Sequence, residues 1–282
     1  MTKRIDLHTH STCSDGTLTP KELAKHAKEM GLSAIALTDH DSMAGVGEFL
    51  KECDKLGIEG IPGVEISAKY RRELHIVGLY AESEEFNNTI ALLANSRGDR
   101  NIRMLKNMRD HGFEVTEDDL ISQTEGAAIS SVGRPHMANA LVSKGYVKDK
   151  DEAFSKYLAK DALFYEKRFS LSPEESISLI KRSGGIAIWA HPAYTADNEE
   201  EMTELAARLK AAGLDGMECL YSRYTPEQTE LCFSVAKKAG ILPSGGSDFH
   251  GENKPDVRLG TVSGGKGYVP YGYLQSLRNT RS

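Results

Sequence analysis

Cysteine is scarce in this sequence, with four residues among 282, at positions 13, 53, 219 and 232. None of them forms a CxxC pair, and their spacing predicts no disulfide framework. The scarcity argues against a thiolate metal site and against a small disulfide-stapled scaffold. We expect buried or half-buried thiols, with Cys13 as the one to watch because it lies inside the first histidine motif.

Long apolar runs are also missing. The longest, such as 34–37 and 186–190, fall far short of the roughly 20 residues that a membrane span needs. The first residues lack the apolar core of a signal peptide. We therefore expect a protein that makes no membrane contact and resides in the cytoplasm.

Positive charge is not in excess either, because the formal net charge is −6. This balance argues against generic adhesion to nucleic acid, so we expect no stable binding of a duplex. An anionic substrate would then need a local positive site, made by metal ions and a few basic side chains. Neither a GxSxG elbow nor a P-loop is present to suggest another route to catalysis.

What the chain does have is a local pattern that occurs three times, over residues 19–40, 172–191 and 225–250. Each copy begins with Thr-Pro or Ser-Pro and has Glu or Gln at the third helical position, which is typical of a capped helix start. The helix ends near a glycine. A short apolar segment then leads to a histidine or an aspartate, so each copy predicts a helix, a strand and a candidate ligand.

Short apolar strands that alternate with amphipathic helices predict a parallel sheet covered by helices. Further strands are expected at 4–8, 60–65, 74–80, 215–220 and 257–262. Seven or eight such units favour closure, so the predicted fold class is α/β, a distorted TIM-like (β/α)7 barrel. Every candidate ligand would lie at the C-terminal end of a strand, where such barrels build their sites.

The alternation stops between about residues 82 and 167. The pattern there is helical and polar, with helices expected at 90–111, 117–123, 135–144 and 150–158. We interpret 82–167 as a helical insertion, or substrate cap, over the mouth of a barrel formed by 1–81 and 168–282. Such insertions are a common place for substrate specificity.

The most informative motif contains His8 and His10, which are two residues apart. On a strand both imidazoles would project from one face, and two converging neutral imidazoles favour a metal site. More histidines and acids follow in order along the chain, at Asp15, His40, Glu65, His75, His191, Asp248 and His250. This mixed nitrogen and oxygen set suits Zn, Mn or Fe, and clustered divalent ions suit phosphoryl chemistry.

These motifs, over 3–80 and 171–262, resemble those of the PHP (polymerase and histidinol phosphatase) family. The chain looks closest to the small stand-alone PHP phosphoesterases that act on nucleotides, which also carry a helical insertion with a Gly-Arg-Pro-His stretch, here 133–136. The resemblance implies three divalent metal ions. Their ligands would be His8, His10, Glu65 and Asp248 for the first, Glu65, His75 and His191 for the second, and Asp15, His40 and His250 for the third.

By the same resemblance, Glu65, His191 and Asp248 are assigned to catalysis, in which metal-activated hydroxide attacks phosphorus. Arg134 is the candidate phosphate clamp, because a guanidinium group matches phosphate oxygens in pairs. Ser131 and His136 are the other candidate substrate contacts. His26 and His111 are interpreted as solvated surface groups. Further candidate phosphate contacts are Lys160, Arg168 and Arg223, each of which we interpret rather as a surface charge. Asp6 and Asp39 lie beside ligands and either orient imidazoles or cap strand ends.

We therefore predict a metal-dependent phosphoesterase whose partner is a small phosphate ester, either a 3′,5′-bisphosphate nucleoside or the 5′ end of a short oligoribonucleotide. A histidinol-phosphate phosphatase is an alternative with the same metal chemistry. A non-catalytic metal-binding PHP module is an alternative of another class. A metal-dependent amidohydrolase is the remaining enzymatic rival, although such sites commonly use a bridging carboxylated lysine where Glu65 fits here.

Overall fold

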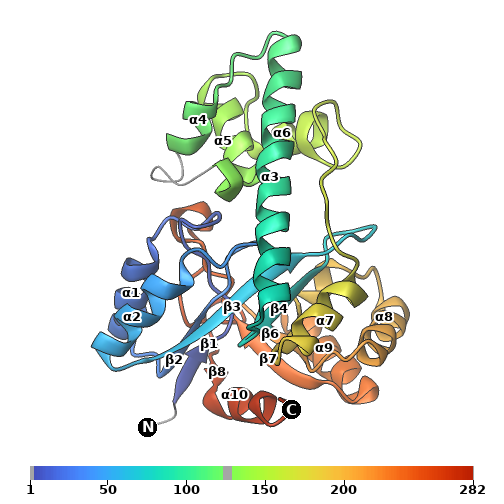
Figure 1. The fold of residues 1–282 in the computed structure, drawn as a ribbon. Helices are drawn as coiled ribbons and strands as arrows, with labels where there is room; N and C mark the ends of the chain where they lie inside the picture. The colour runs from blue at the N-terminus through green and yellow to red at the C-terminus, as the bar shows by residue number, and fades with distance from the viewer. Residues whose placement is uncertain (1–2, 123–128, 282) are drawn as a thin grey trace.

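The computed structural model describes residues 3–122 and 129–281 and consists of a nearly closed barrel with a helical unit above it (Figure 1). The sheet has the strand order β7-β6-β5-β4-β3-β2-β1-β8. The strands are β1 (Arg4–Asp6), β2 (Ala34–Leu37), β3 (Glu59–Ser67), β4 (His75–Leu79), β5 (Ile186–Ala190), β6 (Gly216–Tyr221), β7 (Leu242–Gly246) and β8 (Val269–Pro270). The predicted α/β barrel is confirmed.

Backbone hydrogen bonds just beyond β1 and β7 close the ring. The amide of Asp248 donates to the carbonyl of His8 at 2.8 Å, and the amide of His10 donates to the carbonyl of Phe249 at 3.0 Å. Residues that carry candidate ligands therefore also join the first strand to the seventh. The short strand β8 pairs antiparallel with β1.

Strand β4 departs from the all-parallel prediction, because it pairs antiparallel with both β3 and β5. Only residues 68–74 join β3 to β4, and a parallel crossover needs a dozen residues or more. The reversal places His75 at the start of its strand rather than at the end. It still lies at the mouth, because an antiparallel strand begins where its neighbours end.

The strand predicted at 257–262 is wrong. Only Val262 forms an isolated bridge, with Gly267, and the strand that follows is β8. The backbone of this segment is tied down by a side chain instead, since the amide of Gly260 donates to the Asp6 carboxylate at 2.9 Å.

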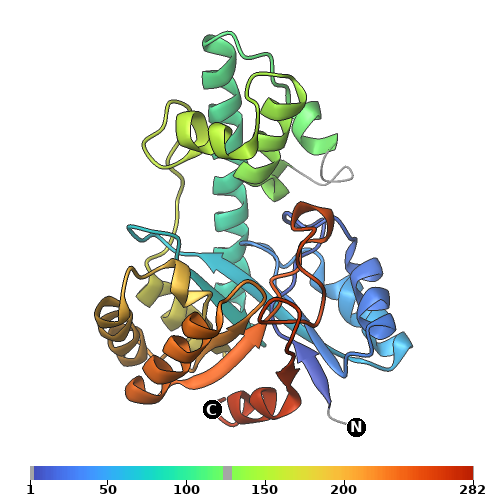
Figure 2. The same cartoon turned by 180° about the vertical axis from the view of Figure 1, so that it is seen from behind.

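Helices cover the outside of the barrel, and their starts follow the predicted caps. Thr19, Ser172 and Thr225 each form a capping box at the start of α1, α7 and α9. The covering helices are α1 (Pro20–Glu29), α2 (Val46–Leu56), α7 (Pro173–Arg182), α8 (Glu199–Ala211), α9 (Pro226–Ala239) and α10 (Tyr271–Arg278). Seen from behind, α10 lies below the strands (Figure 2), and its Leu274 and Leu277 join the cluster of strand side chains there.

The insertion rises on α3 (Glu84–Asp110), which is longer than the predicted 90–111 because Ser83 caps it and it begins six residues earlier. Its lower part packs into the barrel core through Phe86, Ile90 and Leu93, whereas its upper part belongs to a separate core. The shorter helical elements above are α4 (Glu117–Ile121), the 3-10 turn Ile129–Ser131, α5 (Arg134–Ser143), α6 (Lys150–Ala153) and the π turn Phe154–Leu158.

Position 123, the last residue of the helix predicted at 117–123, lies outside the described residues. The division of the chain at 82 and 168 stays an interpretation. Within the described part of the chain, no helix is both long and apolar enough to cross a bilayer.

Candidate metal centre and phosphate site

All nine predicted ligands meet at the upper end of the barrel, beneath the insertion. They come from the loop after β1, from the ends of β2, β5 and β7, from β3, and from the start of β4. Seven of the nine side chains are at most 9% exposed, and the other two, His40 and His75, are 12% exposed. The sequence scatters these residues over more than 240 positions, and the barrel alone brings them together.

Glu65 is the centre of this cluster and is 1% exposed. Its carboxylate has an imidazole nitrogen within 3.3 Å on each of several sides. Oε2 faces His8 at 3.2 Å, His10 at 3.3 Å and His40 at 3.0 Å, and Oε1 faces His75 at 2.8 Å and His191 at 3.1 Å. A carboxylate with both oxygens so placed is suited to bridge two cations.

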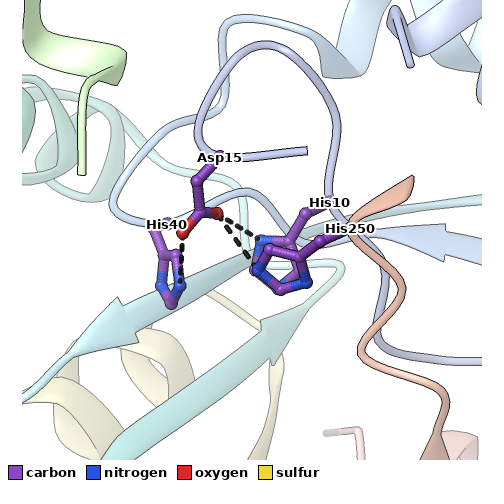
Figure 3. Close-up of side chains that lie close together, drawn as sticks. All are labelled: His10, Asp15, His40 and His250. Atoms are coloured by element: carbon purple, nitrogen blue, oxygen red, sulfur yellow. Dashed lines mark ion pairs between the residues drawn. The ribbon is translucent and has the colours of Figure 1, made fainter. Parts of the chain in front are cut away.

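Asp15 collects a second group of histidines, shown in Figure 3. Its carboxylate lies 3.2 Å from Nε2 of His250, 3.6 Å from Nδ1 of His10 and 3.7 Å from Nε2 of His40. His10, which the resemblance assigned to the first metal, thus lies between both groups. The two groups therefore share an imidazole and contact each other directly.

Asp248 lies on the other side of His10, with 3.2 Å between Oδ1 and Nε2 of the imidazole. Its second oxygen accepts a hydrogen bond from the Tyr221 hydroxyl at 2.6 Å and pairs with the ammonium group of Lys254. Neither Tyr221 nor Lys254 was among the predicted site residues. Together they orient the Asp248 carboxylate so that one oxygen faces the imidazoles.

Strained backbone occurs at this end of the barrel. Three of the six non-glycine residues with a left-handed φ in the described part of the chain are Asp41, His191 and Asp248, with φ of 50°, 33° and 55°. Such conformations are costly for residues with a Cβ and persist where the surroundings enforce them, often at functional sites. Here they turn each side chain inward just past the end of a strand.

The electrostatics of the cluster suit bound cations. Burial raises the pKa of Glu65, but the charges of His40 and His8 outweigh it and hold that pKa well below its usual range. Burial lowers the pKa of His8, but the surrounding carboxylates raise it well above its usual range. A carboxylate that stays ionised when buried is a suitable ligand for a cation, and a metal ion would replace the proton on the imidazole.

Unpaired buried atoms point to the same conclusion. Nε2 of His8, Nε2 of His10, Nδ1 of His40 and Oε2 of Glu65 are buried and lack a hydrogen-bond partner of good geometry. Leaving such atoms unsatisfied is costly, and divalent metal ions are the partners that imidazole and carboxylate groups share. The residues present therefore fit metal ions of the Zn, Mn or Fe type, which supply Lewis-acid chemistry.

Glu218 is the ligand-supporting residue that sequence reasoning missed. It is buried in β6, and its Oε1 accepts from Nδ1 of His8 at 2.9 Å while Oε2 accepts from the amide of His191 at 2.7 Å. Its signal in the sequence is an acid inside an otherwise apolar strand, in Gly216–Tyr221. Such a residue is seldom buried without a partner.

The two acids that lie beside ligands in the sequence, Asp6 and Asp39, have roles that differ from that of Glu218. Asp6 accepts from the amide and hydroxyl of Ser247 and touches no imidazole, so it fastens a loop at a strand end. Asp39 binds the hydroxyls of Ser11 and Ser14, and only Ser14 approaches His10, at 3.4 Å. Of the two open interpretations, the structure supports strand-end anchoring.

A cluster of arginines lies above the histidines, between the barrel and the insertion. Its members are Arg97, Arg100, Arg134 and Arg168. Arg97 and Arg168 both pair with the buried Asp41, and the pKa of that carboxyl is lowered although burial raises it. The interpretation of Arg168 as a surface charge is wrong, because its side chain is only 14% exposed. Lys160 and Arg223 are surface groups, as expected.

Positive charge in this arginine cluster exceeds the negative charge beside it. Burial and the neighbouring guanidinium groups lower the pKa of Arg100, and the charge of Asp41 acts in the opposite direction. Burial also lowers the pKa of Arg134, which the charge of Glu73 raises. Nε of Arg97, Nε of Arg100 and Nη1 of Arg168 are buried without a hydrogen-bond partner. Donors and charge left over in one place are the features of an anion site.

The start of α5 reaches down to the metal ligands. Gly133 lies beside Asp15, and its amide donates to Nδ1 of His136 at 2.9 Å. This leaves the buried Nε2 of His136 without a partner. Ser131 is half-buried on the preceding turn, and Arg134 donates to the carbonyl of Leu158 at 3.2 Å. His26 and His111 lie on outer helices, as expected.

Comparison with known proteins agrees with this architecture. The PHP domain family matches residues 6–171, and the chain belongs to that family. It is 36% identical over 254 residues to a 5′-3′ exoribonuclease of Haemophilus influenzae, covering 89% of this chain and 91% of the relative. It is 33% identical over 261 residues to a 3′,5′-nucleoside bisphosphate phosphatase of Chromobacterium violaceum, covering 90% of each.

A solved structure extends the likeness over the whole chain. It is a Bifidobacterium adolescentis protein assigned by prediction as a metal-dependent phosphoesterase, with a TM-score of 0.84, 29% identity, and coverage of 99% of this chain and 97% of that one. Fold, site and relatives together support a metal-dependent phosphoesterase, a hydrolase. The histidinol-phosphatase and non-catalytic alternatives are not favoured.

Proposed function

We propose that this enzyme hydrolyses a phosphate ester of a nucleotide that carries a second phosphate group. The substrate would be a nucleoside 3′,5′-bisphosphate or the 5′ end of a short oligoribonucleotide. One observation carries the proposal: a cluster of metal-type ligands lies beside a cluster of four arginines whose charge the neighbouring carboxylates, Asp41 and Glu73, do not balance. Such a pair of sites fits two phosphate groups of one small molecule. Residence in the cytoplasm stays a prediction.

Three divalent ions are part of this proposal. His8, His10, Glu65 and Asp248 would hold the first, Glu65, His75 and His191 the second, and Asp15, His40 and His250 the third. The contacts around Glu65 and Asp15 support this division, with His10 placed to serve either neighbour. When bound, such ions lower the pKa of a coordinated water and offset charge on the phosphoryl oxygens.

The residues themselves would position the substrate and discriminate between substrates. Glu65, His191 and Asp248 face the space where the reacting phosphoryl group would lie, and the strained backbones of the latter two fix their direction. His136 offers an unpaired N–H from Nε2, suited to a phosphoryl or leaving-group oxygen. Ser131 adds a hydroxyl at the rim.

The arginine cluster would hold the second phosphate. Arg134 would act as the bidentate clamp, and Arg97, Arg100 and Arg168 would supply charge behind it. The relatives named above act on substrates of this kind, which supports the proposal.

A substrate panel with Mn²⁺-loaded enzyme tests the proposal. The panel contains adenosine 3′,5′-bisphosphate, AMP, histidinol phosphate, a short 5′-phosphorylated oligoribonucleotide and p-nitrophenyl phosphate. We expect kcat/KM for the bisphosphate or the oligonucleotide to exceed the others at least tenfold, about 1.4 kcal/mol of transition-state binding. A preference for histidinol phosphate, or no release from any nucleotide, contradicts it.

Two variants locate the second phosphate. Arg134→Ala is expected to remove that preference while sparing p-nitrophenyl phosphate. Arg103→Ala is the matched control, because Arg103 lies on α3 but is 47% exposed and pairs with Glu166. An equal loss on the simple aryl phosphate would show that Arg134 does not recognise the second phosphate.

A further inference from the structure

The turn that follows His191 presents an aromatic ring at the mouth of the metal centre. This turn is the 3-10 segment Pro192–Tyr194, and Tyr194 is 42% exposed. Its ring centroid lies 6.2 Å from that of His191 and 5.7 Å from that of Tyr221. Of the three exposed aromatic side chains in the described part of the chain, Phe169, Tyr194 and Tyr268, Tyr194 is the one whose ring contacts a candidate metal ligand.

Hydrogen bonds hold this turn rigidly on both sides of Tyr194. The amide of Ala193 donates to the hydroxyl of Tyr224 at 3.0 Å. The hydroxyl of Thr195 donates to the carbonyl of Glu73 at 2.9 Å and accepts from the indole of the buried Trp189 at 3.3 Å. The exposed ring is thus preorganised, which reduces the entropy lost when a ligand packs on it.

Tyr194 also packs edge-on against a wall of two buried rings, Tyr221 and Tyr224. The first of these is the tyrosine that donates to Asp248. The charges of two ion pairs, Lys254 with Asp248 and Arg223 with Asp256, act on the Tyr194 phenol. Because its ring contacts His191, the free part of the ring stands next to the candidate phosphoryl site, among charged groups, rather than on a remote apolar surface.

We infer that Tyr194 is a specificity-determining residue that stacks on the base of the substrate nucleotide. The inference rests on the proposed function and goes beyond it by naming the residue that recognises the base. A planar base on a rigid half-exposed ring gains stacking energy whatever its hydrogen-bonding pattern, because every base has a π-face. The base would lie on the Tyr194 side of the mouth.

The test compares substrates with and without a base. Adenosine 3′,5′-bisphosphate is paired with a tetrahydrofuran 3,5-bisphosphate that keeps both phosphates and lacks the base. Tyr194→Ala is expected to lower kcat/KM on the nucleotide roughly five- to 150-fold, mainly through KM, as expected for a stacking contact. On the base-free substrate the change should stay below twofold, and Tyr194→Phe should behave like the wild type on both.

A matched control uses Tyr268, which is 41% exposed and lines a hollow with Arg4 at the start of β1, whereas the candidate ligands follow the end of that strand. Tyr268→Ala should leave both substrates unaffected. The inference is overturned if Tyr194→Ala lowers kcat/KM equally on both substrates, since the ring would then only pack against Tyr221 and Tyr224. It is also overturned if the wild type gains nothing from the base.

A binding measurement separates this inference from the proposed function. The fluorescence of 2-aminopurine riboside 5′-monophosphate is expected to be quenched on binding to the Mn²⁺-loaded wild type and to the Phe variant, but not with Tyr194→Ala. Quenching without hydrolysis of any nucleotide would refute the proposed function and keep the stacking role. Binding with no difference between the wild type and the Ala variant would refute the stacking role.

Discussion

Glu218 and His8 form a buried hydrogen-bonded pair that joins β6 to the loop after β1. The 2.9 Å contact between Oε1 and Nδ1 places the proton on Nδ1, which turns the lone pair of Nε2 toward Glu65. The other oxygen of Glu218 fixes the amide of His191. One carboxylate from β6 therefore orients the imidazole of one ligand and the backbone of another.

Replacing Glu218 by Gln should weaken metal binding without removing a ligand. Losing a carboxylate that orients a ligating histidine typically costs 10- to 100-fold in metal affinity or activity, and we expect a loss of that size here. Metal competition with a chelator and kcat/KM at limiting Mn²⁺ measure it. Asp215→Asn is the control, because Asp215 pairs with Lys181 just before β6 and touches no ligand. Unchanged metal affinity in Glu218→Gln would disprove this role.

Removing metal ions should destabilise the protein. The buried acids and imidazoles around Glu65 then lose their shared partners, and binding at 100 times Kd stabilises a native state by about 2.7 kcal/mol per site. We expect Mn²⁺ to raise Tm relative to an EDTA-treated sample by on the order of 5–10 °C. Differential scanning calorimetry at matched ionic strength checks this. A variant with Glu65→Gln should show a much smaller shift, and a full shift in it would contradict the central position of Glu65.

Asp41 should be important for stability because it is the buried counter-ion of Arg97 and Arg168. Breaking a buried charge pair costs about 3–5 kcal/mol, since the remaining charge stays buried and uncompensated. We expect Asp41→Asn to lower the free energy of unfolding by an amount of this size in urea titrations. Asp256→Asn breaks an exposed pair with Arg223 and should cost less than about 1 kcal/mol. Similar losses in the two variants would argue against this role of Asp41.

The contribution of Asp41 should also depend on pH. The pKa of its carboxyl is lowered in the folded protein relative to about 3.9 in the unfolded chain. A group with a lowered folded pKa stabilises fully above its unfolded pKa and loses that contribution as pH falls toward the folded value. The difference in the free energy of unfolding between the wild type and Asp41→Asn should therefore stay constant from about pH 7 to 5 and shrink below about pH 4. If this difference in the free energy of unfolding grew on acidification, the prediction would be contradicted.

Gly246 should tolerate no side chain. It ends β7 where that strand meets β1, and a Cβ there would contact the backbone nitrogen of His8 at 2.7 Å. We expect Gly246→Ala to separate the two strands and to cause loss of folded protein or of metal binding, as measured by circular dichroism and metal content. Gly272→Ala is the matched control. A Cβ at Gly272 meets nothing within 4 Å, and alanine favours α10 by about 0.5–1 kcal/mol. Equal behaviour of the two variants would refute the closure argument.

Local signals in the sequence predicted local structure well. The capping boxes at Thr19, Ser172 and Thr225 start helices in the structure because their hydrogen bonds involve residues only three positions apart. The direction of the strands was harder to predict from the sequence. His75 begins an antiparallel strand because of the short connection before it, and the segment 257–262 is apolar but pairs with no strand. Pairing partners decide such cases, and they lie far away in the sequence.

The side chains of the site also divide into those that the sequence predicts and those that it does not. The nine histidines and acids could be predicted because ligand chemistry restricts residue type and an HxH spacing shows a shared face. Glu218 and the burial of Arg168 could not, since a lone acid in a strand or an arginine in a loop has no local pattern. Their roles follow from His8 and Asp41, which lie 210 and 127 positions away.

The sequence by itself determined the helix starts, the alternation of strands and helices, and the types of residue that bind metal, because all of these depend on neighbours within a few positions or on intrinsic chemistry. The tertiary structure decided which groups meet. Closure of β1 against β7 places Glu65 among five imidazoles, and the rise of α3 sets buried arginines above them. Burial then makes the charges strong, because a carboxylate or guanidinium group removed from water must find its partner inside the protein.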